Sequence, residues 1–169
     1  ARSYEDGIAQ TINADVADLD AALTAIQVPA DRRAQLLDKV ANFRSTHKLP
    51  AGLPDEFADY PRGAAAYHQQ RFDDARRFWK QSLARPAGQR HYRSTWAAFM
   101  MGKTYLESDP ERASIWFQRT RDLAAAGFGD RLGLAASSFG WEARAELNRK
   151  RYERAIELYL AQDATGDET

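Results

Sequence analysis

Three segments of the chain, residues 62–83, 101–123 and 141–162, follow one template, and this repetition constrains the fold more than any other feature. Each segment carries a small residue, an aromatic or aliphatic residue about one turn later, a polar break, an alanine, and an aromatic residue four positions further on. The small residues are Gly63, Gly102 and Ala143, and the alanine–aromatic pairs are Ala75/Trp79, Ala113/Phe117 and Ala155/Tyr159. Such spacing predicts two helices joined by a short turn in each segment.

Close packing explains why a helix pair needs these residue types. Small side chains let the two helices of a pair approach each other, and the large aromatic rings fill the gap to the next pair. In the second segment, Ala113 and Phe117 are also expected to hold the two helices together. No stretch alternates apolar and polar residues over a useful length, so no strand is expected. The sequence therefore predicts an all-α fold.

The repeated template resembles the tetratricopeptide repeat, a helix–turn–helix unit, over roughly residues 55–162. The equivalent alanines lie further apart than the about 34 residues of the standard repeat, so these repeats are divergent. The resemblance implies an α-α superhelix of three units, at about residues 55–86, 94–126 and 131–162. We expect them to form one continuous solenoid that extends from residue 55 to residue 169.

The first 48 residues carry a different pattern, which predicts an N-terminal helical hairpin. The first helix has apolar residues at steps of three and four, at Tyr4, Ile8, Ile12, Val16, Leu19, Leu23 and Ile26. Pro29 ends this helix, and Asp31 is the predicted N-cap of the next one. The first helix is acidic and the second is basic, which favours their antiparallel pairing. A Pro- and Gly-containing linker over 49–54 separates the hairpin from the repeats.

The composition excludes several classes of function. Lys and Arg together equal Asp and Glu at 24 each, so the formal net charge is zero and no nucleic-acid partner is expected. The chain has no cysteine, which excludes thiolate metal sites, disulfides and cysteine nucleophiles. No apolar run approaches the roughly 18 residues of a membrane span. A chain that starts at Ala1 fits either a cytoplasmic protein or one that is exported and processed, so the compartment stays open.

The stretch Gly102-Lys103-Thr104 has the ending of a phosphate-binding loop, but its context does not fit one. Such a loop needs another glycine five positions before Gly102, where this chain has Ala97, and the preceding residues are bulky and apolar. We expect this stretch to be helical, with Lys103 facing outward. The residues that follow predict the start of the next helix, with Asp109 as its N-cap and Pro110 at its first position.

No motif predicts catalysis, a metal or a cofactor. The three histidines, His47, His68 and His91, lack metal-ligand spacing, and no serine lies in a nucleophile elbow. No pair of carboxylates stands out, although a groove enzyme that uses such a pair stays a less favoured alternative. The basic stretches 85–93 and 149–154 leave nucleic-acid binding as another weak alternative, against the reading that they are solvated turns.

The resemblance also implies which residues would face a ligand, because the first helix of each unit lines the concave surface of such an array. The predicted protein- or peptide-binding residues are Tyr60, Tyr67, Trp96, Phe99, Lys103 and Arg144. Lys103 and Arg144 fall on equivalent positions of consecutive units, where two cations could grip a carboxylate. Core packing of Trp96 and Phe99, and plain solvation of the two cations, stay open as alternatives. The family's carboxylate clamp uses Asn and Lys at positions where this chain has Tyr60, Ala64 and Phe99, so a chaperone-tail clamp is not expected.

The resulting expectation is a non-catalytic scaffold that needs no cofactor and binds a protein or peptide partner, for which the two cations suggest acidic character. A second expectation concerns the last helix, where Ile156, Leu158, Tyr159 and Leu160 are apolar. Repeat arrays normally end in a polar capping element. The alternative function is therefore self-association through the C-terminal helix, or coverage of that end by further repeats or another chain.

Overall fold

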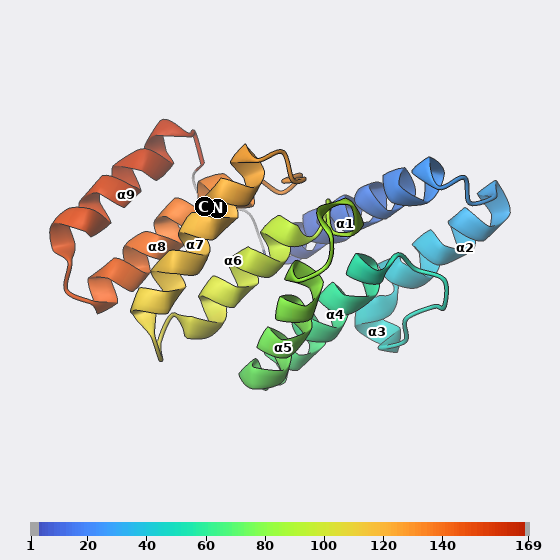
Figure 1. Cartoon of the computed structure of the whole chain (residues 1–169), viewed down its shortest axis with the longest axis horizontal. Coiled ribbons are helices and arrows are strands. Elements are labelled where there is room, and N and C mark those ends of the chain that lie inside the picture. The colour runs from blue at the N-terminus through green and yellow to red at the C-terminus, as the bar shows by residue number, and fades with distance from the viewer. Residues whose placement is uncertain (1–3, 168–169) are drawn as a thin grey trace. The chain divides into compact units, whose positions relative to one another are not determined.

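The computed structural model describes residues 4–167, and over these residues it contains nine α-helices, one short 3₁₀ helix and no strand (Figure 1). This confirms the predicted all-α fold. The helices are α1 (Tyr4–Ala25), α2 (Ala30–Ala41), α3 (Phe43–Thr46), α4 (Asp55–His68), α5 (Phe72–Leu83), α6 (Ser94–Tyr105), α7 (Pro110–Ala125), α8 (Leu134–Asn148) and α9 (Tyr152–Ala164). The chain divides into two compact units, Ala1–Ala58 and Asp59–Thr169, and the division falls inside α4.

The first unit contains the α1–α2 hairpin. Leu19 and Leu23 of α1 and Leu36 of α2 are fully buried, as their helical spacing predicts. An ion pair of 3.0 Å between Arg33 and Asp20 joins the two helices, in line with their opposite charges. The predicted cap of α2 is wrong: the helix already begins at Ala30, directly after Pro29, so Asp31 lies in the first turn.

The second unit is a succession of helix pairs, α4 with α5, α6 with α7, and α8 with α9. Each helix from α5 onward packs on the next one, and α6 also contacts α8, so the first helices of the second and third pairs lie side by side (Figure 1). This serial packing is the arrangement expected of an α-α superhelix. The predicted boundaries of the individual repeats stay a prediction.

Two glycines determine how closely the helices of a pair approach each other. A Cβ atom added at Gly63 would lie 2.3 Å from Nε1 of Trp79, and one added at Gly102 would lie 2.6 Å from the Phe117 ring. Both rings are fully buried. The predicted close approach of two helices at a small residue is therefore confirmed for α4–α5 and for α6–α7. The rings of Trp79 and Phe117 fill space within their own pair, as expected for Phe117, whereas the general prediction placed the aromatics between pairs.

The third pair packs differently. Tyr159 is 41% exposed, and Leu158 takes the buried position on α9, where it packs with Ala143 and Ala155. The small residue of this pair is an alanine, whose Cβ occupies the space that a glycine leaves to a ring. Tyr159 therefore lies on the exposed apolar face predicted for the last helix, whereas Leu158, predicted on the same face, is buried within the pair.

The start of α7 confirms the predicted helix signal. The Asp109 carboxylate accepts a hydrogen bond of 3.1 Å from the backbone N–H of Arg112, and Pro110 is the first helical residue. The stretch Gly102-Lys103-Thr104 lies inside α6, so its backbone amides belong to a helix and form no phosphate loop.

Replacing Gly102 by Ala should destabilise the second unit. Alanine favours a helix by about 0.5–1 kcal/mol over glycine, but the added methyl would force apart α6 and the buried Phe117 ring, at a cost of about 1–3 kcal/mol. Urea unfolding followed by far-ultraviolet circular dichroism measures the change. The control is Gly88→Ala, since a Cβ at Gly88 meets nothing within 4 Å. Equal stability of the two variants would contradict this packing.

Candidate functional site

Three first helices of the second unit bring aromatic rings around one lysine. The Nζ atom of Lys103 on α6 lies 4.5 Å from the ring centroid of Trp141 on α8, 5.9 Å from that of Tyr67 on α4, and 6.0 Å from that of Phe99 on α6. The guanidinium of Arg144 lies 4.8 Å from the same Trp141 ring. We call Tyr67, Phe99, Lys103, Trp141 and Arg144 the first-helix cluster.

The carboxylate of Asp130 caps the start of α8, the helix that carries Trp141 and Arg144. The carboxylate of Asp130 accepts hydrogen bonds of 2.7 and 3.0 Å from the backbone N–H groups of Leu134 and Ala135. These bonds satisfy two of the free donors of the first turn. Burial raises the pKa of Asp130, while the two backbone hydrogen bonds act against this rise.

Over the described residues, the two cations of the first-helix cluster lack a carboxylate counterion. Among residues 4–167, no carboxylate oxygen lies within 4.0 Å of Lys103 or Arg144. Burial lowers the pKa of Lys103, and the charge of Arg144 lowers this pKa further. The aromatic faces offset part of the lost hydration through cation–π attraction. An anion would lower the energy of this surface, since it would partner both cations at once.

The predicted site residues fall into two groups. Tyr67, Phe99, Lys103 and Arg144 meet in the first-helix cluster, although Phe99 is only 8% exposed and also packs on Phe117 at 5.8 Å between ring centroids.

Tyr60, which is partly buried, and the buried Trp96 belong to the second group, which packs around Trp79 and Arg93. The Trp96 side chain is 2% exposed, and its ring meets Tyr60 edge-on at 5.5 Å between centroids. The Arg93 guanidinium lies 3.8 Å above Trp96, and Tyr60 stacks on the buried Trp79. Of the two alternatives for Trp96, its burial favours core packing. A ligand-binding role of Tyr60 and Trp96 stays a prediction.

Trp141 was missed by the sequence reasoning, although it supplies the ring nearest to Lys103. A signal for it exists. Trp141 precedes Arg144 by three residues, and positions three apart share one face of a helix. A search for aromatics one turn from each predicted cation would have found it.

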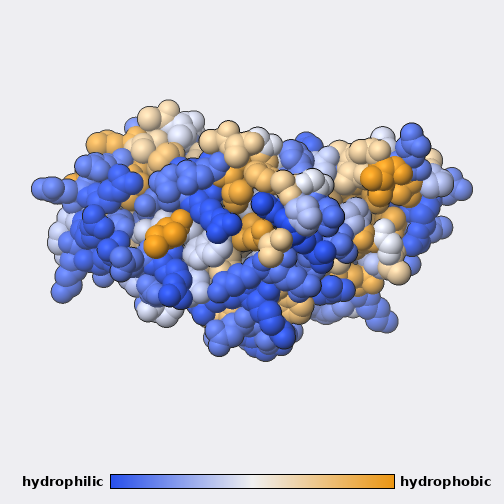
Figure 2. Space-filling model, viewed as in Figure 1, coloured by the Kyte–Doolittle hydropathy of each residue, from blue (hydrophilic) through white to orange (hydrophobic). Residues whose placement is uncertain are grey.

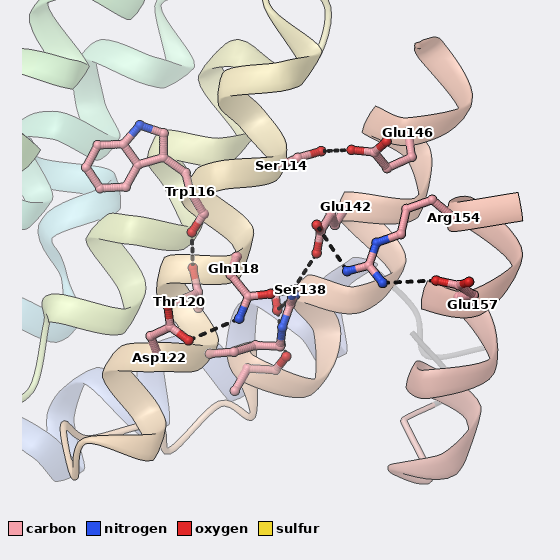
Figure 3. A network of polar contacts seen from close by, with 12 residues as sticks. Ser114, Trp116, Gln118, Thr120, Asp122, Ser138, Glu142, Glu146, Arg154 and Glu157 are labelled. Carbon is pink, nitrogen blue, oxygen red and sulfur yellow. Dashed lines mark hydrogen bonds and ion pairs between the residues drawn. The ribbon is translucent and has the colours of Figure 1, made fainter. Parts of the chain in front are cut away.

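Two buried glutamates on α8, Glu142 and Glu146, are the candidates in the second unit for an acid–base pair of carboxylates (Figure 3). Glu142 forms an ion pair with Arg121 of α7 and lies 3.9 Å from Arg154 of α9. Glu146 accepts hydrogen bonds from Ser114 at 2.6 Å and from Arg149 at 3.0 Å.

Both glutamates line an open pocket of about 520 Å³ between α7, α8 and α9, but each already has arginine partners. Buried carboxylates paired in this way fix the register of the three helices, because breaking one pair would leave a buried charge. Within the described part of the chain, no group of three or more His, Cys, Asp or Glu residues could hold a metal ion. The geometry therefore favours a structural role for these carboxylates over acid–base chemistry.

Comparison with known proteins adds no family to this description. No protein-family model, curated protein or solved structure matches the chain. Among the helices that the structure describes, none is both long and apolar enough to cross a membrane.

Replacing Lys103 by Met should stabilise the folded protein at neutral pH, by an amount on the order of 1 kcal/mol, because Met keeps the apolar contacts and removes a poorly solvated charge. Because the pKa of Lys103 is lower in the folded protein than in the unfolded chain, its charge destabilises the folded protein by the full amount at every pH below the folded-state pKa. The cost falls as the pH rises towards the pKa of the unfolded lysine. The free energy of unfolding of the wild type should therefore increase in that range relative to that of Lys103→Met.

Urea unfolding at about pH 7 and about pH 10 tests both statements. Lys80→Met is the matched control, since this exposed lysine should change the stability by less than about 0.5 kcal/mol. A loss of stability in Lys103→Met would mean that the ammonium is a structural group of the fold.

Proposed function

We propose that the chain is a non-catalytic scaffold that binds an acidic protein or peptide segment on the surface formed by α4, α6 and α8. The observation that supports this proposal is the pair of cations, Lys103 and Arg144, without a carboxylate partner among the described residues and beside three aromatic rings. A carboxylate of the partner would replace the lost hydration of both cations. The rings of Tyr67 and Trp141 would add apolar contact area next to it.

The proposal includes the finer assignment of the three helix pairs as divergent tetratricopeptide-like units. Support comes from the packing of Gly63 on Trp79 and of Gly102 on Phe117, since these are the contacts that the repeated template requires. The serial contacts of α5 through α9 fit the same assignment. In such arrays the first helices form the ligand surface, and here those helices carry the first-helix cluster.

The double variant Lys103→Gln/Arg144→Gln should weaken the binding of an acidic peptide by about 10- to 100-fold, because hydrogen bonds to charged groups contribute about 1.5–3 kcal/mol each and only part of that is lost. The probe is a fluorescein-labelled peptide of glutamates interrupted by leucine, and fluorescence anisotropy measures its dissociation constant. The binding should also weaken with added salt.

Two controls make this experiment specific. The same peptide with glutamine in place of glutamate should not bind, and Arg119→Gln should bind like the wild type, since Arg119 is exposed on α7 outside the first-helix cluster. Equal affinity of the wild type and the double variant would overturn the proposed site.

Self-association through α9 is the second candidate function. Tyr152, Ile156, Tyr159 and Leu160 follow helical spacing along α9 and are 41–65% exposed. Figure 2 shows hydrophobic atoms at the surface over α9, among hydrophilic ones. A second copy of the chain could cover this face.

Sedimentation velocity over a range of concentrations tests the second candidate. The wild type should show a concentration-dependent shift to a larger species, and Ile156→Glu combined with Leu160→Glu should abolish it, because isologous contacts would bring like charges together. Leu158, which is buried, stays unchanged in this variant. A wild-type monomer at all concentrations would remove self-association as a candidate.

A further inference from the structure

A second group of cations lies on the second helices, away from the first-helix cluster. Positions 73, 76, 77 and 80 of α5 share one helical face, and they line an open pocket of about 470 Å³ together with residues from the end of α6 and the start of α7. The lining residues are Asp73, Arg76, Arg77, Lys80, Tyr105 and Arg112. We call this the basic pocket. Four of its six lining residues are cationic and one is a carboxylate.

Arg76 is held in a fixed orientation at the edge of the basic pocket. Its Nε atom donates to Oγ1 of Thr104 at 2.9 Å, and its Nη2 atom donates to the carbonyl oxygen of Thr104 at 2.6 Å. The guanidinium also lies 3.8 Å from the ring centroid of Tyr105. Thr104 and Tyr105 are themselves buried, so this arginine loses little further conformational entropy when a ligand binds.

A second guanidinium approaches the same ring from another helix. Arg112 of α7 lies 5.1 Å from the Tyr105 centroid. The buried Tyr105 thus brings together two arginines from α5 and α7 at one pocket. Planar guanidinium groups match the oxygens of a phosphoryl group, which they contact through paired hydrogen bonds.

The carboxylates around the basic pocket are weak competitors for its cations. Asp73 contacts Arg76 at 3.2 Å, but its side chain is fully exposed, and such exposed pairs contribute little. Asp109 lies 3.6 Å from Arg112, and its other oxygen caps α7. Lys80 has no carboxylate oxygen within 4.0 Å among residues 4–167. Asp74 pairs with Arg77 at 3.1 Å, and both of these side chains are exposed too. The four cations of the pocket thus face three carboxylates in exposed pairs, and Lys80 supplies the excess positive charge that is open to solvent.

We propose that the basic pocket binds a phosphoryl group carried by a protein segment, such as a phosphoserine or phosphothreonine side chain. A phosphoryl dianion would engage both arginines that stack on Tyr105 and the ammonium of Lys80. Arg112 of α7 joins the three cations of α5 at one pocket, and the chain has no net charge, which favours a single phosphorylated side chain over a nucleic-acid backbone. The surface over α5 is hydrophilic in Figure 2, so recognition here rests on charge.

The test uses the full chain labelled with ¹⁵N and a blocked five-residue peptide with a central phosphoserine between alanines. The Nε–Hε signals of Arg76 and Arg112 should shift saturably with the phosphopeptide and stay unchanged with the serine version. Arg112→Gln and Lys80→Gln should each weaken this binding by about 5- to 50-fold. Both side chains are exposed, and circular dichroism checks that the variants stay folded.

Three further arms make the outcome decisive. The control Arg119→Gln and the first-helix variant Lys103→Gln/Arg144→Gln should both bind the phosphopeptide like the wild type, which separates this proposal from the proposed function. Inorganic phosphate and a single-stranded DNA oligomer should bind more weakly than the phosphopeptide. No saturable shift with the phosphopeptide, or equal or tighter binding of phosphate or DNA, would overturn the proposal.

Discussion

The close approach of a glycine to an aromatic ring is the contact on which the second unit depends. Trp79 and Phe117 occupy space that a single methyl group at Gly63 or Gly102 would fill. Because the rings lie against the helix backbone, the two helices of each pair are held at a short separation. The second and third pairs then place their first helices side by side, as the contact between α6 and α8 shows.

This packing also determines which way Lys103 points. Successive residues of a helix are rotated by about 100°, so the residue after Gly102 turns away from Phe117 and towards the neighbouring first helices. Along the same face of α6, exposure grows from Trp96 at 2% and Phe99 at 8% to the half-buried Lys103. One face of α6 is thus buried at Trp96 and partly exposed at Lys103, and the first-helix cluster lies at its exposed end.

Much of this arrangement could be predicted from local sequence. The helix pairs, the cap at Asp109 and the packing glycines follow from residue types at short spacing, and the structure confirms them. The cap at Asp31 could not be predicted correctly, because Pro29 starts α2 earlier than a capping side chain would. The burial of Leu158 depends on its packing against Ala143 of another helix, which spacing within α9 does not reveal.

Composition conceals the local charge distribution on which both binding proposals rest. A net charge of zero describes the sum over the whole chain, whereas a ligand responds to the charges within about 10 Å of it. Between α7, α8 and α9, buried glutamates and arginines neutralise one another, so a charged ligand would have to break existing pairs there. At Lys103 and Arg144 no such pairs exist among the described residues, and at the basic pocket the pairs are exposed and weak. An anion therefore gains most where the fold has left cations without buried partners.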